Sequence, residues 1–427
     1  MSRYSGPPSS SQGQPLSSVG VYPPSGMPGH MPSPQTVPPY NVAVASPSQY
    51  VQQTGPSPNQ VHYGHPSMTE VHSFGNLPVI AHAWNKDRTQ IAVSLGKNDV
   101  RIYQKQAGKW RHIHTLSEHL SRVLAIDWAP TTNRIVSASA DYNAYVWTFE
   151  NNIWKQQMVE LQRTSRAVCC VKWSPNENKF AIGSSDKNVG ICYYETEQRF
   201  WAAEMIKKKP KSTVTCIAWH PNNQLIVAGS CDYRVRIYSA YIKAVDGQPQ
   251  ISNWGIISNT GDLLHEFQSE SGWIHDVAFS PLGENLAWVS HNSIIFAVSA
   301  KNLSRITMEI TNYLPFRCII FVSESTLIVA GHEFSPLIYN YDERKGTIDF
   351  VEKLDQQETS IGKQAINRLF DQPSMQTQTP EPISTHQSMI TQILPYQSDH
   401  SNLVKISSAD LFGQVVIWNL AGRKIKK

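Results

Sequence analysis

The sequence predicts an all-β protein, a seven-bladed β-propeller preceded by a disordered N-terminal tail. One observation is the change in composition near residue 70. A second is a recurring short apolar strand that ends in an aromatic residue or proline before a turn, at Trp84, Trp128, Trp173, Trp219, Phe279, Phe321 and Pro395. The third is their spacing of 44, 45, 46, 60, 42 and 74 residues. A period of roughly 40–45 residues is typical of WD-repeat blades with four strands each.

The segment 1–69 differs in composition from the repeats that follow it. Residues 1–68 hold 14 of the 27 prolines, and Arg3 is their only charged side chain. Such a segment cannot bury enough apolar surface to offset its ordering entropy, so we expect disorder with local polyproline II structure. A proline pair beside an aromatic residue, as at Pro38-Pro39-Tyr40, could dock in an SH3 or WW groove. A passive tail is the simpler interpretation.

The repeats in residues 70–427 differ in how fully they carry the polar tetrad of a WD blade. A complete tetrad has a His, a Ser or Thr, an Asp in the turn before the third strand, and a Trp at the end of that strand. The second repeat has nearly the full set, which is His119, Ser139 (with Ser137 as the alternative), Asp141 and Trp147. The same acid position holds Lys97, Asp186, Asp232, His291, Glu333 and Phe412 in the other repeats. We expect these tetrads to be structural, because they satisfy polar groups buried between blades.

Composition and motifs argue against catalysis and against several classes of partner. A formal charge of +4 is too small to predict nucleic-acid binding. No apolar run reaches 18 residues, so no membrane span is expected. The six cysteines have no zinc-site spacing, and we expect reduced thiols in a cytoplasmic protein without metal or cofactor. No hydrolase, P-loop, kinase or dinucleotide motif occurs, and nothing in the sequence predicts acids gathered in a central channel. We therefore predict no catalytic residues.

Several stretches go beyond the general WD pattern. They are His82–Ile91, Trp173–Phe180, Trp219–Leu225, Gly229–Asp232, Tyr238–Lys243, Gly272–His275 and Ala287–His291. Taken in register, they closely resemble the WD-repeat subunit 1 of the actin-related protein 2/3 complex. The resemblance runs from about His72 to the carboxyl terminus, and the tail has no counterpart in the usual family member.

The resemblance implies a non-catalytic scaffold that supports the nucleation of branched actin filaments. Its implied partners are the other subunits of the complex, the actin filament and nucleation-promoting factors. Its implied location is the cytoplasmic actin cytoskeleton, at actin patches or the cell cortex. The alternative function is that of a WD-repeat adaptor or substrate receptor in a ubiquitin-ligase or trafficking complex, which would use a pocket on the ring face.

The two long steps between repeats predict two insertions. The first, at about 243–271, extends the edge of a blade in the resembling family, and we interpret it as mainly structural. The second, at about 352–386, is rich in Gln, Ser and Thr. Within it, Ile366, Leu369 and Phe370 have the i, i+3, i+4 spacing of one helical face. A single helical turn is not stable alone in water, so it must pack on the propeller or on a partner.

For the second insertion we favour contact with a partner, because the resembling family carries a short protruding helix at this place that engages actin or an actin-related subunit. We expect Ile366, Leu369 and Phe370 to bury against that partner, with Arg368 at the rim of the contact.

A basic run, Lys207-Lys208-Lys209-Pro210-Lys211, links the third and fourth repeats. A solvated loop between blades is the simplest interpretation, and a nuclear-localisation signal is another. The functional alternative is that Lys207, Lys208 and Lys209 steer an acidic partner toward the ring.

Overall fold

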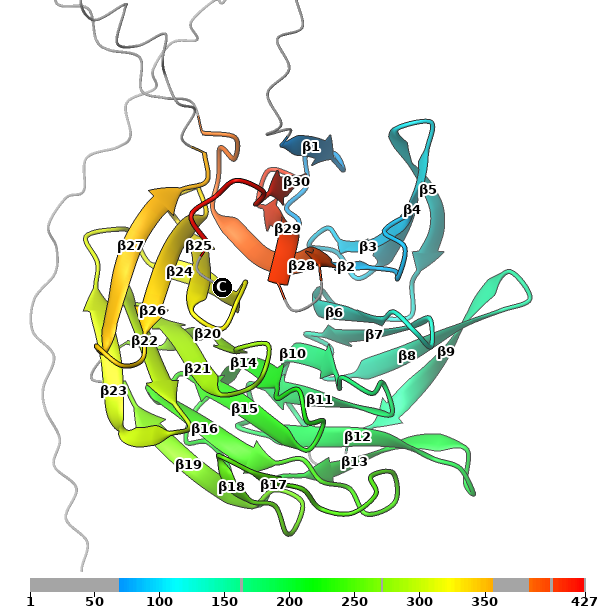
Figure 1. Ribbon diagram of the computed structural model, residues 1–427. Coiled ribbons are helices and arrows are strands. Elements are labelled where there is room, and N and C mark those ends of the chain that lie inside the picture. Colours follow the sequence, from blue (N-terminus) through cyan, green and yellow to red (C-terminus); the bar gives the residue numbers. More distant parts are fainter. Residues whose placement is uncertain (1–68, 162–163, 270–271, 356–383, 400–401, 426–427) are drawn as a thin grey trace, which may run out of the picture. The chain divides into compact units, whose positions relative to one another are not determined.

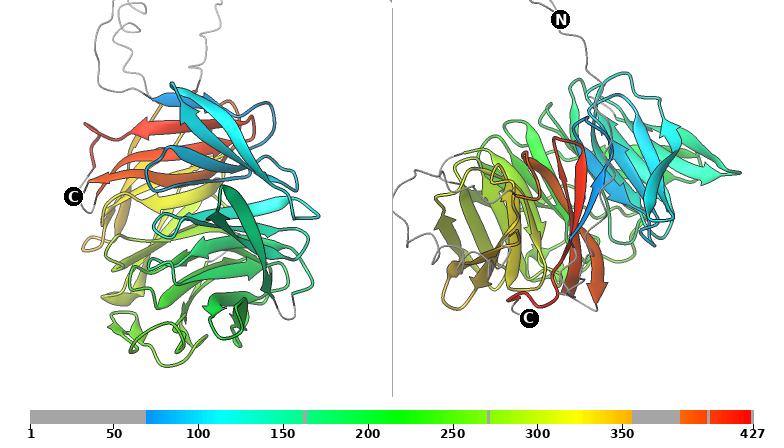
Figure 2. Two further views of the ribbon diagram at one scale, coloured as in Figure 1. Left: turned by 90° about the vertical axis from the view of Figure 1, so that its right-hand side faces the viewer. Right: turned by 90° about the horizontal axis from the view of Figure 1, so that it is seen from above.

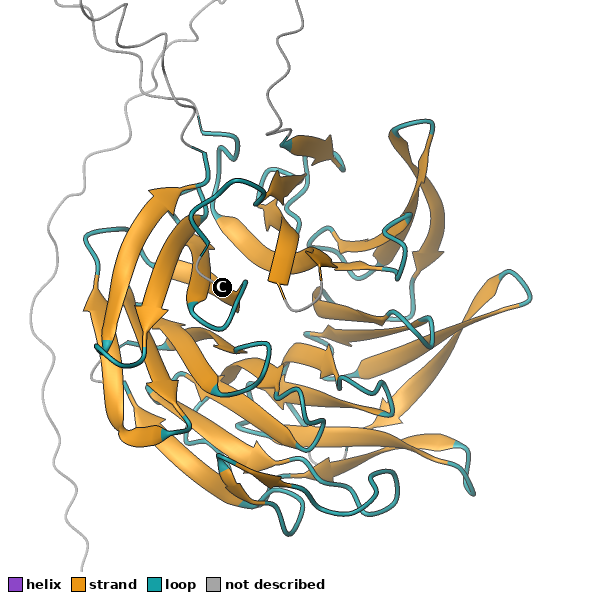
Figure 3. Ribbon diagram, in the orientation of Figure 1, coloured by secondary structure: helices purple, strands orange, loops and turns teal. Residues whose placement is uncertain are grey.

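The computed structural model describes residues 69–161, 164–269, 272–355, 384–399 and 402–425. These residues belong to one compact unit, residues 64–427. The described residues contain β-strands and no helices, as Figure 3 shows. The strands form four-stranded blades around a channel, and in each blade one strand lies innermost while the others follow outward (Figure 1). The prediction of a seven-bladed WD-repeat propeller is confirmed. The disorder expected for 1–69 concerns residues that, apart from Thr69, lie outside the described ones.

The first three blades each have four strands. Blade one consists of β2 (Ala81–Trp84), β3 (Gln90–Ser94), β4 (Val100–Gln106) and β5 (Lys109–Leu116). Blade two consists of β6 (Val123–Ala129), β7 (Arg134–Ser139), β8 (Ala144–Glu150) and β9 (Ile153–Glu160). Blade three consists of β10 (Val168–Trp173), β11 (Lys179–Ser184), β12 (Val189–Glu195) and β13 (Phe200–Met205).

The next three blades keep this order from the channel outward. Blade four consists of β14 (Val214–Trp219), β15 (Leu225–Ser230), β16 (Arg234–Ser239) and β19 (Leu263–Gln268). Blade five consists of β20 (Ile274–Phe279), β21 (Asn285–Ser290), β22 (Ile294–Ser299) and β23 (Asn302–Ile310). Blade six consists of β24 (Phe316–Phe321), β25 (Thr326–Gly331), β26 (Leu337–Asp342) and β27 (Thr347–Lys353).

Blade seven is assembled from both ends of the propeller sequence, and this closes the ring. It consists of β28 (Ile390–Asp399), β29 (Asn402–Asp410), β30 (Gln414–Asn419) and β1 (Glu70–Ser73). The strand β1 pairs antiparallel with β30, with Glu70 opposite Ile417, so the start of the domain supplies its last outer strand. The turned views in Figure 2 show β1 beside the strands from the end of the chain. The first strands of blades one and seven also lie side by side.

The apolar side chains follow the expected strand pattern, because the inner strands are covered on both faces by neighbouring blades. The second strands, such as Leu225–Ser230 and Thr326–Gly331, are buried at every position. The core lies between blades rather than inside one. For example, Phe267 of blade four stacks on Trp288 of blade five with ring centroids 5.8 Å apart.

The first insertion is shorter than predicted. The sequence assigned 243–271 to it, but Leu263–Gln268 is β19, the outer strand of blade four, which pairs with β16. The additional chain is therefore 240–262, which joins the third and fourth strands of this blade. It contains a small hairpin made of β17 (Ile251–Ser252) and β18 (Gly255–Ile256). The predicted boundary was wrong because the long step between Trp219 and Phe279 gives only the number of additional residues. It does not show whether these residues come before or after the outer strand of the blade.

Candidate interaction surfaces

The tetrad of blade two is a buried hydrogen-bonded chain. The indole Nε1 of Trp147 donates to Ser137 Oγ at 2.9 Å, and that hydroxyl is 2.8 Å from His119 Nε2. His119 Nδ1 is 2.9 Å from Asp141 Oδ2. Since a carboxylate only accepts and an indole only donates, a neutral His119 carries its proton on Nδ1 and accepts the hydroxyl proton on Nε2. Each polar group of this tetrad has a partner, which indicates a structural role.

The tetrad serine is Ser137, not Ser139 as the sequence analysis favoured. Ser139 lies two residues further along the strand, where its hydroxyl donates to Ser121 O and accepts from the amide of Asp141. Burial lowers the pKa of His119, although Asp141 beside it acts to raise it. Burial acts to raise the pKa of Asp141, but amide hydrogen bonds and His119 outweigh burial and lower it.

Blade seven has a second complete tetrad, which the sequence analysis did not find. Trp418 Nε1 donates to Ser408 Oγ at 2.7 Å, and His386 is 2.6 Å from that hydroxyl and 2.8 Å from Asp410 Oδ2. In blade two the acid precedes the tryptophan by six residues. The same interval before Trp418 leads to Phe412, whereas the acid of blade seven is Asp410. The interval of ten residues between Ser and Trp is shared by both blades and was the usable signal.

The channel holds charged residues that the sequence analysis did not expect there. Asp127 Oδ2 accepts the amide of Trp173 at 2.7 Å, and Asp276 Oδ2 accepts the amide of Ile319 at 3.0 Å. In each pair the carboxylate reaches from one blade to the first strand of the next. A third link of this kind connects blade seven to blade one, where the ring closes: Gln392 Oε1 accepts the amide of His82. A polar residue inside an apolar first strand was the signal for these positions.

The electrostatics of the channel reflect burial. Burial raises the pKa of Asp276 to about 6, although the amides of Ile319 and Val277 act in the opposite direction. Burial together with Arg317 lowers the pKa of His275 to about 4. A cavity of about 360 Å³ remains between the first strands. Because Asp127 and Asp276 are engaged by backbone amides of neighbouring blades, they have the properties of structural joints between blades.

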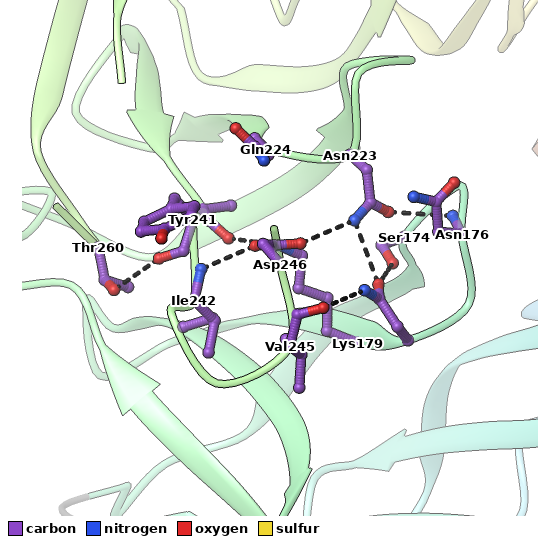
Figure 4. Close-up of polar contacts among 12 residues, drawn as sticks. Ser174, Asn176, Lys179, Asn223, Gln224, Tyr241, Ile242, Val245, Asp246 and Thr260 are labelled. Carbon is purple, nitrogen blue, oxygen red and sulfur yellow. Dashed lines mark hydrogen bonds and ion pairs between the residues drawn. The ribbon is translucent and has the colours of Figure 1, made fainter. Parts of the chain in front are cut away.

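The first insertion is anchored by a buried polar network (Figure 4). Lys179 Nζ of blade three is in contact with Asp246 Oδ2 of the insertion and donates to Ala240 O at 2.7 Å. Asp246 also accepts from the amide of Ile242 at 2.8 Å and from Asn223 Nδ2 at 3.2 Å. Burial lowers the pKa of Lys179, against the opposing effect of Asp246. The insertion is therefore held rigidly across blades three and four.

The two rims of the ring carry different connections. The upper rim is formed by two kinds of connection. One is the turn between the second and third strands of a blade, and the other is the connection that leads into the first strand of a blade. The lower rim carries the turns between first and second strands and those between third and fourth strands. Antiparallel order within each blade places these connections at opposite ends of the strands. Backbone bonds join the two kinds of upper connection, as between the amide of Ala140 and Arg122 O.

The basic run lies on the upper rim, between blades three and four. Its backbone is fixed, because Tyr238 Oη donates to Lys208 O at 2.9 Å and the amide of Lys211 donates to Asp232 Oδ2 at 2.7 Å. The side chains of Lys207, Lys208 and Lys209 are exposed. None of their ammonium groups pairs with a carboxylate among the described residues. The structure thus presents a fixed loop with unpaired positive charge.

The described ends of the second insertion also lie on the upper rim. The carboxylate of Asp355 accepts hydrogen bonds from the amide and the hydroxyl of Thr385, so the chain leaves and returns at one point. The predicted partner-binding residues Ile366, Arg368, Leu369 and Phe370 lie outside the described residues, and their role stays a prediction.

Three exposed aromatic residues on the upper rim have an unusual backbone. Tyr142, Tyr233 and Phe334 occupy equivalent turn positions with φ of 73°, 67° and 61°. A bulky side chain rarely adopts this left-handed region, which glycine accepts at little cost. Their side chains are exposed by 49%, 42% and 38%. The equivalent residues Lys187 and Ser293 have φ of 64° and 62°, so the conformation belongs to a turn geometry that several blades share.

Comparison with known proteins gives consistent matches along the propeller. The family profile of the WD domain, G-beta repeat, matches residues 110–148, and that of the anaphase-promoting complex subunit 4 WD40 domain matches residues 171–253. Actin-related protein 2/3 complex subunit 1A-B of Xenopus laevis is 42% identical over 357 residues, which is 82% of this chain and 96% of that protein. Subunit 1 of Schizosaccharomyces pombe is 33% identical, over 80% of this chain and 97% of its own length. No helix in the described part of the chain is long and apolar enough to cross a membrane.

Proposed function

The chain belongs to the family of subunit 1 of the actin-related protein 2/3 complex, and from this we propose that it is the propeller subunit of such a complex and acts there as a non-catalytic scaffold for the nucleation of branched actin filaments. The similarity to a relative over 96% of that relative's length carries the proposal. The adaptor or substrate-receptor alternative is not favoured, because the similar proteins are named as subunits of this complex.

The scaffold role is supported by how the polar groups of the propeller are used. In both tetrads the His bonds the Asp and a serine, and Asp127 and Asp276 hold amides of neighbouring blades. Groups that are saturated in this way stiffen the ring. Loops on a stiff ring lose little further entropy when they bind, which suits a protein that organises other subunits.

The upper rim is the surface that we propose for contacts with the actin filament and nucleation-promoting factors. It combines the fixed basic loop at Lys207–Lys209 with both described ends of the second insertion. We include Ile366, Leu369 and Phe370 as contact residues on the strength of their helical spacing, with Arg368 at the rim of the contact. Association with the actin cytoskeleton at patches or the cell cortex follows from these contacts.

Affinity purification of the tagged full-length chain from its own cells, followed by mass spectrometry, tests the assembly. We expect two actin-related proteins and the smaller subunits at near-equal amounts. Recovery of a cullin adaptor or of coat proteins without actin-related proteins would overturn the proposal.

Removing the positive charge of the basic loop tests the upper-rim contact. In the purified complex, the variant Lys207→Ala/Lys208→Ala/Lys209→Ala should bind an acidic activator segment about three- to tenfold more slowly at low salt, because steering of a charged partner acts on the association rate. The difference should shrink at high ionic strength. Stopped-flow measurement across a salt series gives both quantities.

The matched control removes the same number of exposed lysines near the lower rim, as Lys155→Ala/Lys243→Ala/Lys345→Ala. It should leave the association rate close to that of the unaltered complex. Equal effects of the two triple variants would mean that net charge, rather than the basic loop, matters.

A further inference from the structure

The outer strand of blade five, β23, carries a row of exposed apolar side chains. Ile306, Met308 and Ile310 are exposed by 38%, 47% and 67%. They alternate along the strand and therefore lie on one face. Charged or imidazole side chains instead occupy much of the outer strands β5, β19 and β27, for example Arg111, His265 and Glu352. Such residues protect exposed sheet edges from pairing. The strand β23 also carries Arg305 and Glu309, but they lie on the face opposite to its apolar row.

The pairing of β23 with β22 determines which backbone amides of β23 point to its free edge. Glu309 lies opposite Ile295 and Thr307 lies opposite Ala297 on β22, and the amide of Thr311 donates to Ser293 O. Since hydrogen-bonded pairs alternate along an antiparallel ladder, the amides of residues 307 and 309 also point to β22. The amides of the three exposed apolar residues 306, 308 and 310 point away from the sheet.

Two other outer strands of the ring are not left open in this way. The strands β9 and β13 pair with each other in parallel, with Val159 opposite Trp201, and join blades two and three into one eight-stranded sheet. Figure 1 shows β23 at the circumference of the ring, and the described residues place no strand beyond it in its sheet. A nine-residue outer strand with a free edge and an exposed apolar row on one face can pair with a further strand.

We propose that the edge of β23 accepts an extended strand from another subunit of the complex by β-strand addition, an inference that rests on the proposed function. The added strand forms main-chain bonds with residues 306, 308 and 310. Its side chains alternate between apolar on the face shared with Met308 and polar on the face shared with Arg305 and Glu309.

The chemistry of the edge selects this partner over others. The exposed row of Ile306, Met308 and Ile310 carries no charge, which disfavours nucleic acid and anionic membranes because both are bound through cations. A second copy of this chain would also fit an edge. The similar proteins are numbered as one subunit of a larger complex, which favours a different chain as the occupant.

Hydrogen exchange read at single amides tests the proposal on the full chain, alone and in the purified complex. We expect the amides of Ile306, Met308 and Ile310 to exchange at least about tenfold more slowly in the complex, whereas the amides of Thr307 and Glu309 are protected in both samples. Equal exchange of the three outward amides in both samples overturns the proposal. Slower exchange that depends on the concentration of the isolated chain assigns the edge to a second copy and also overturns it.

A pair of substitutions provides the second measurement. Ile306→Lys/Met308→Lys places two gatekeeper charges on the edge, and the amount of co-purified subunits should fall by about tenfold. The control Ile153→Lys/Met158→Lys changes the same residue types on β9, where they are exposed by 64% and 56%, and should leave recovery unchanged.

The controls separate this inference from the proposed function. If the unaltered chain recovers no actin-related proteins, the proposed function fails first. If the unaltered chain and both double variants recover the complex equally, the assembly stands and the strand-addition proposal is wrong. Circular dichroism of each variant verifies that the propeller remains folded, and a third variant, Met308→Pro, removes one outward amide without removing a bond to β22.

Discussion

The lower and upper rims of this ring use their polar side chains in opposite ways. On the lower rim, a side chain of one blade holds the turn of its neighbour, as Glu177 does when it accepts the amides of Thr131 and Thr132 at 2.8 and 2.6 Å. On the upper rim, the acids hold a connection of their own blade, as Asp141 does with the amide of Leu120 at 2.8 Å. These lower-rim side chains thus tie blades together, whereas the upper-rim acids tie a blade to the connection that leads into it.

This difference shows which surface is available for partners. Glu177, Asn223 and Lys179 on the lower rim are largely or fully buried and satisfied within the ring. On the upper rim, the basic loop and the aromatic turn residues project into solvent from a fixed backbone. Substitutions on the lower rim should therefore mainly change stability, and those on the upper rim should mainly change binding.

The largest effect is expected at Lys179, where blade three meets the first insertion. Lys179→Ala would leave the buried carboxylate of Asp246 without its cation, and removal of one member of a buried pair costs about 3–5 kcal/mol. Urea unfolding of the full chain measures this loss. The control Lys187→Ala removes an exposed lysine from the upper rim and should change the free energy of unfolding by less than about 0.5 kcal/mol. Similar losses in both variants would erase the distinction between the rims.

The channel acid Asp276 should give a pH-dependent effect of intermediate size. Its pKa in the folded protein, about 6, lies above the ordinary value of 3.8, so the folded state holds the proton more tightly than the unfolded state. Its contribution to stability is fully present below about pH 4 and is lost as the pH rises to about 6, by about 3 kcal/mol.

The variant Asp276→Asn isolates this contribution, because other groups, including His275, titrate in the same range. The free energy of unfolding of the unaltered chain minus that of the variant should fall as the pH rises from 4 to 6 and then stay level. Chemical unfolding at each pH provides the comparison. A difference that does not change with pH would mean that Asp276 titrates as an ordinary carboxyl group.

The smallest effect is expected at the strained turns of the upper rim. Tyr142→Gly relieves the positive φ, and this should raise the free energy of unfolding by up to about 1 kcal/mol. Phe350→Gly is the matched control, since Phe350 is also an exposed aromatic residue but lies inside β27. It should lower stability, because glycine in a strand loses more backbone entropy. Guanidinium unfolding midpoints compare the two, and a loss at Tyr142 as large as at Phe350 would argue against strain.

The repeats show why the fold could be predicted but the tetrads only partly. Burial of a first strand between two blades imposes a local pattern, so Trp84, Trp173 and Trp219 identify the ends of β2, β10 and β14. The tetrad depends on residues brought together across two turns. A shift of two residues therefore moved the acid of blade seven from the expected Phe412 to Asp410.

The period, the number of blades and the family resemblance could be predicted without a structure, because each depends on residue types at local spacing. The composition of the tail can be read directly from the residues. The packed ring was needed to show that Asp127 and Asp276 hold neighbouring blades, that Ser137 rather than Ser139 completes a tetrad, and that β23 has an open edge. The bond from the amide of His82 to Gln392 spans 310 positions of the chain. The physical reason is that such contacts depend on how distant strands pack around a closed ring, which the residue pattern of a single blade does not contain.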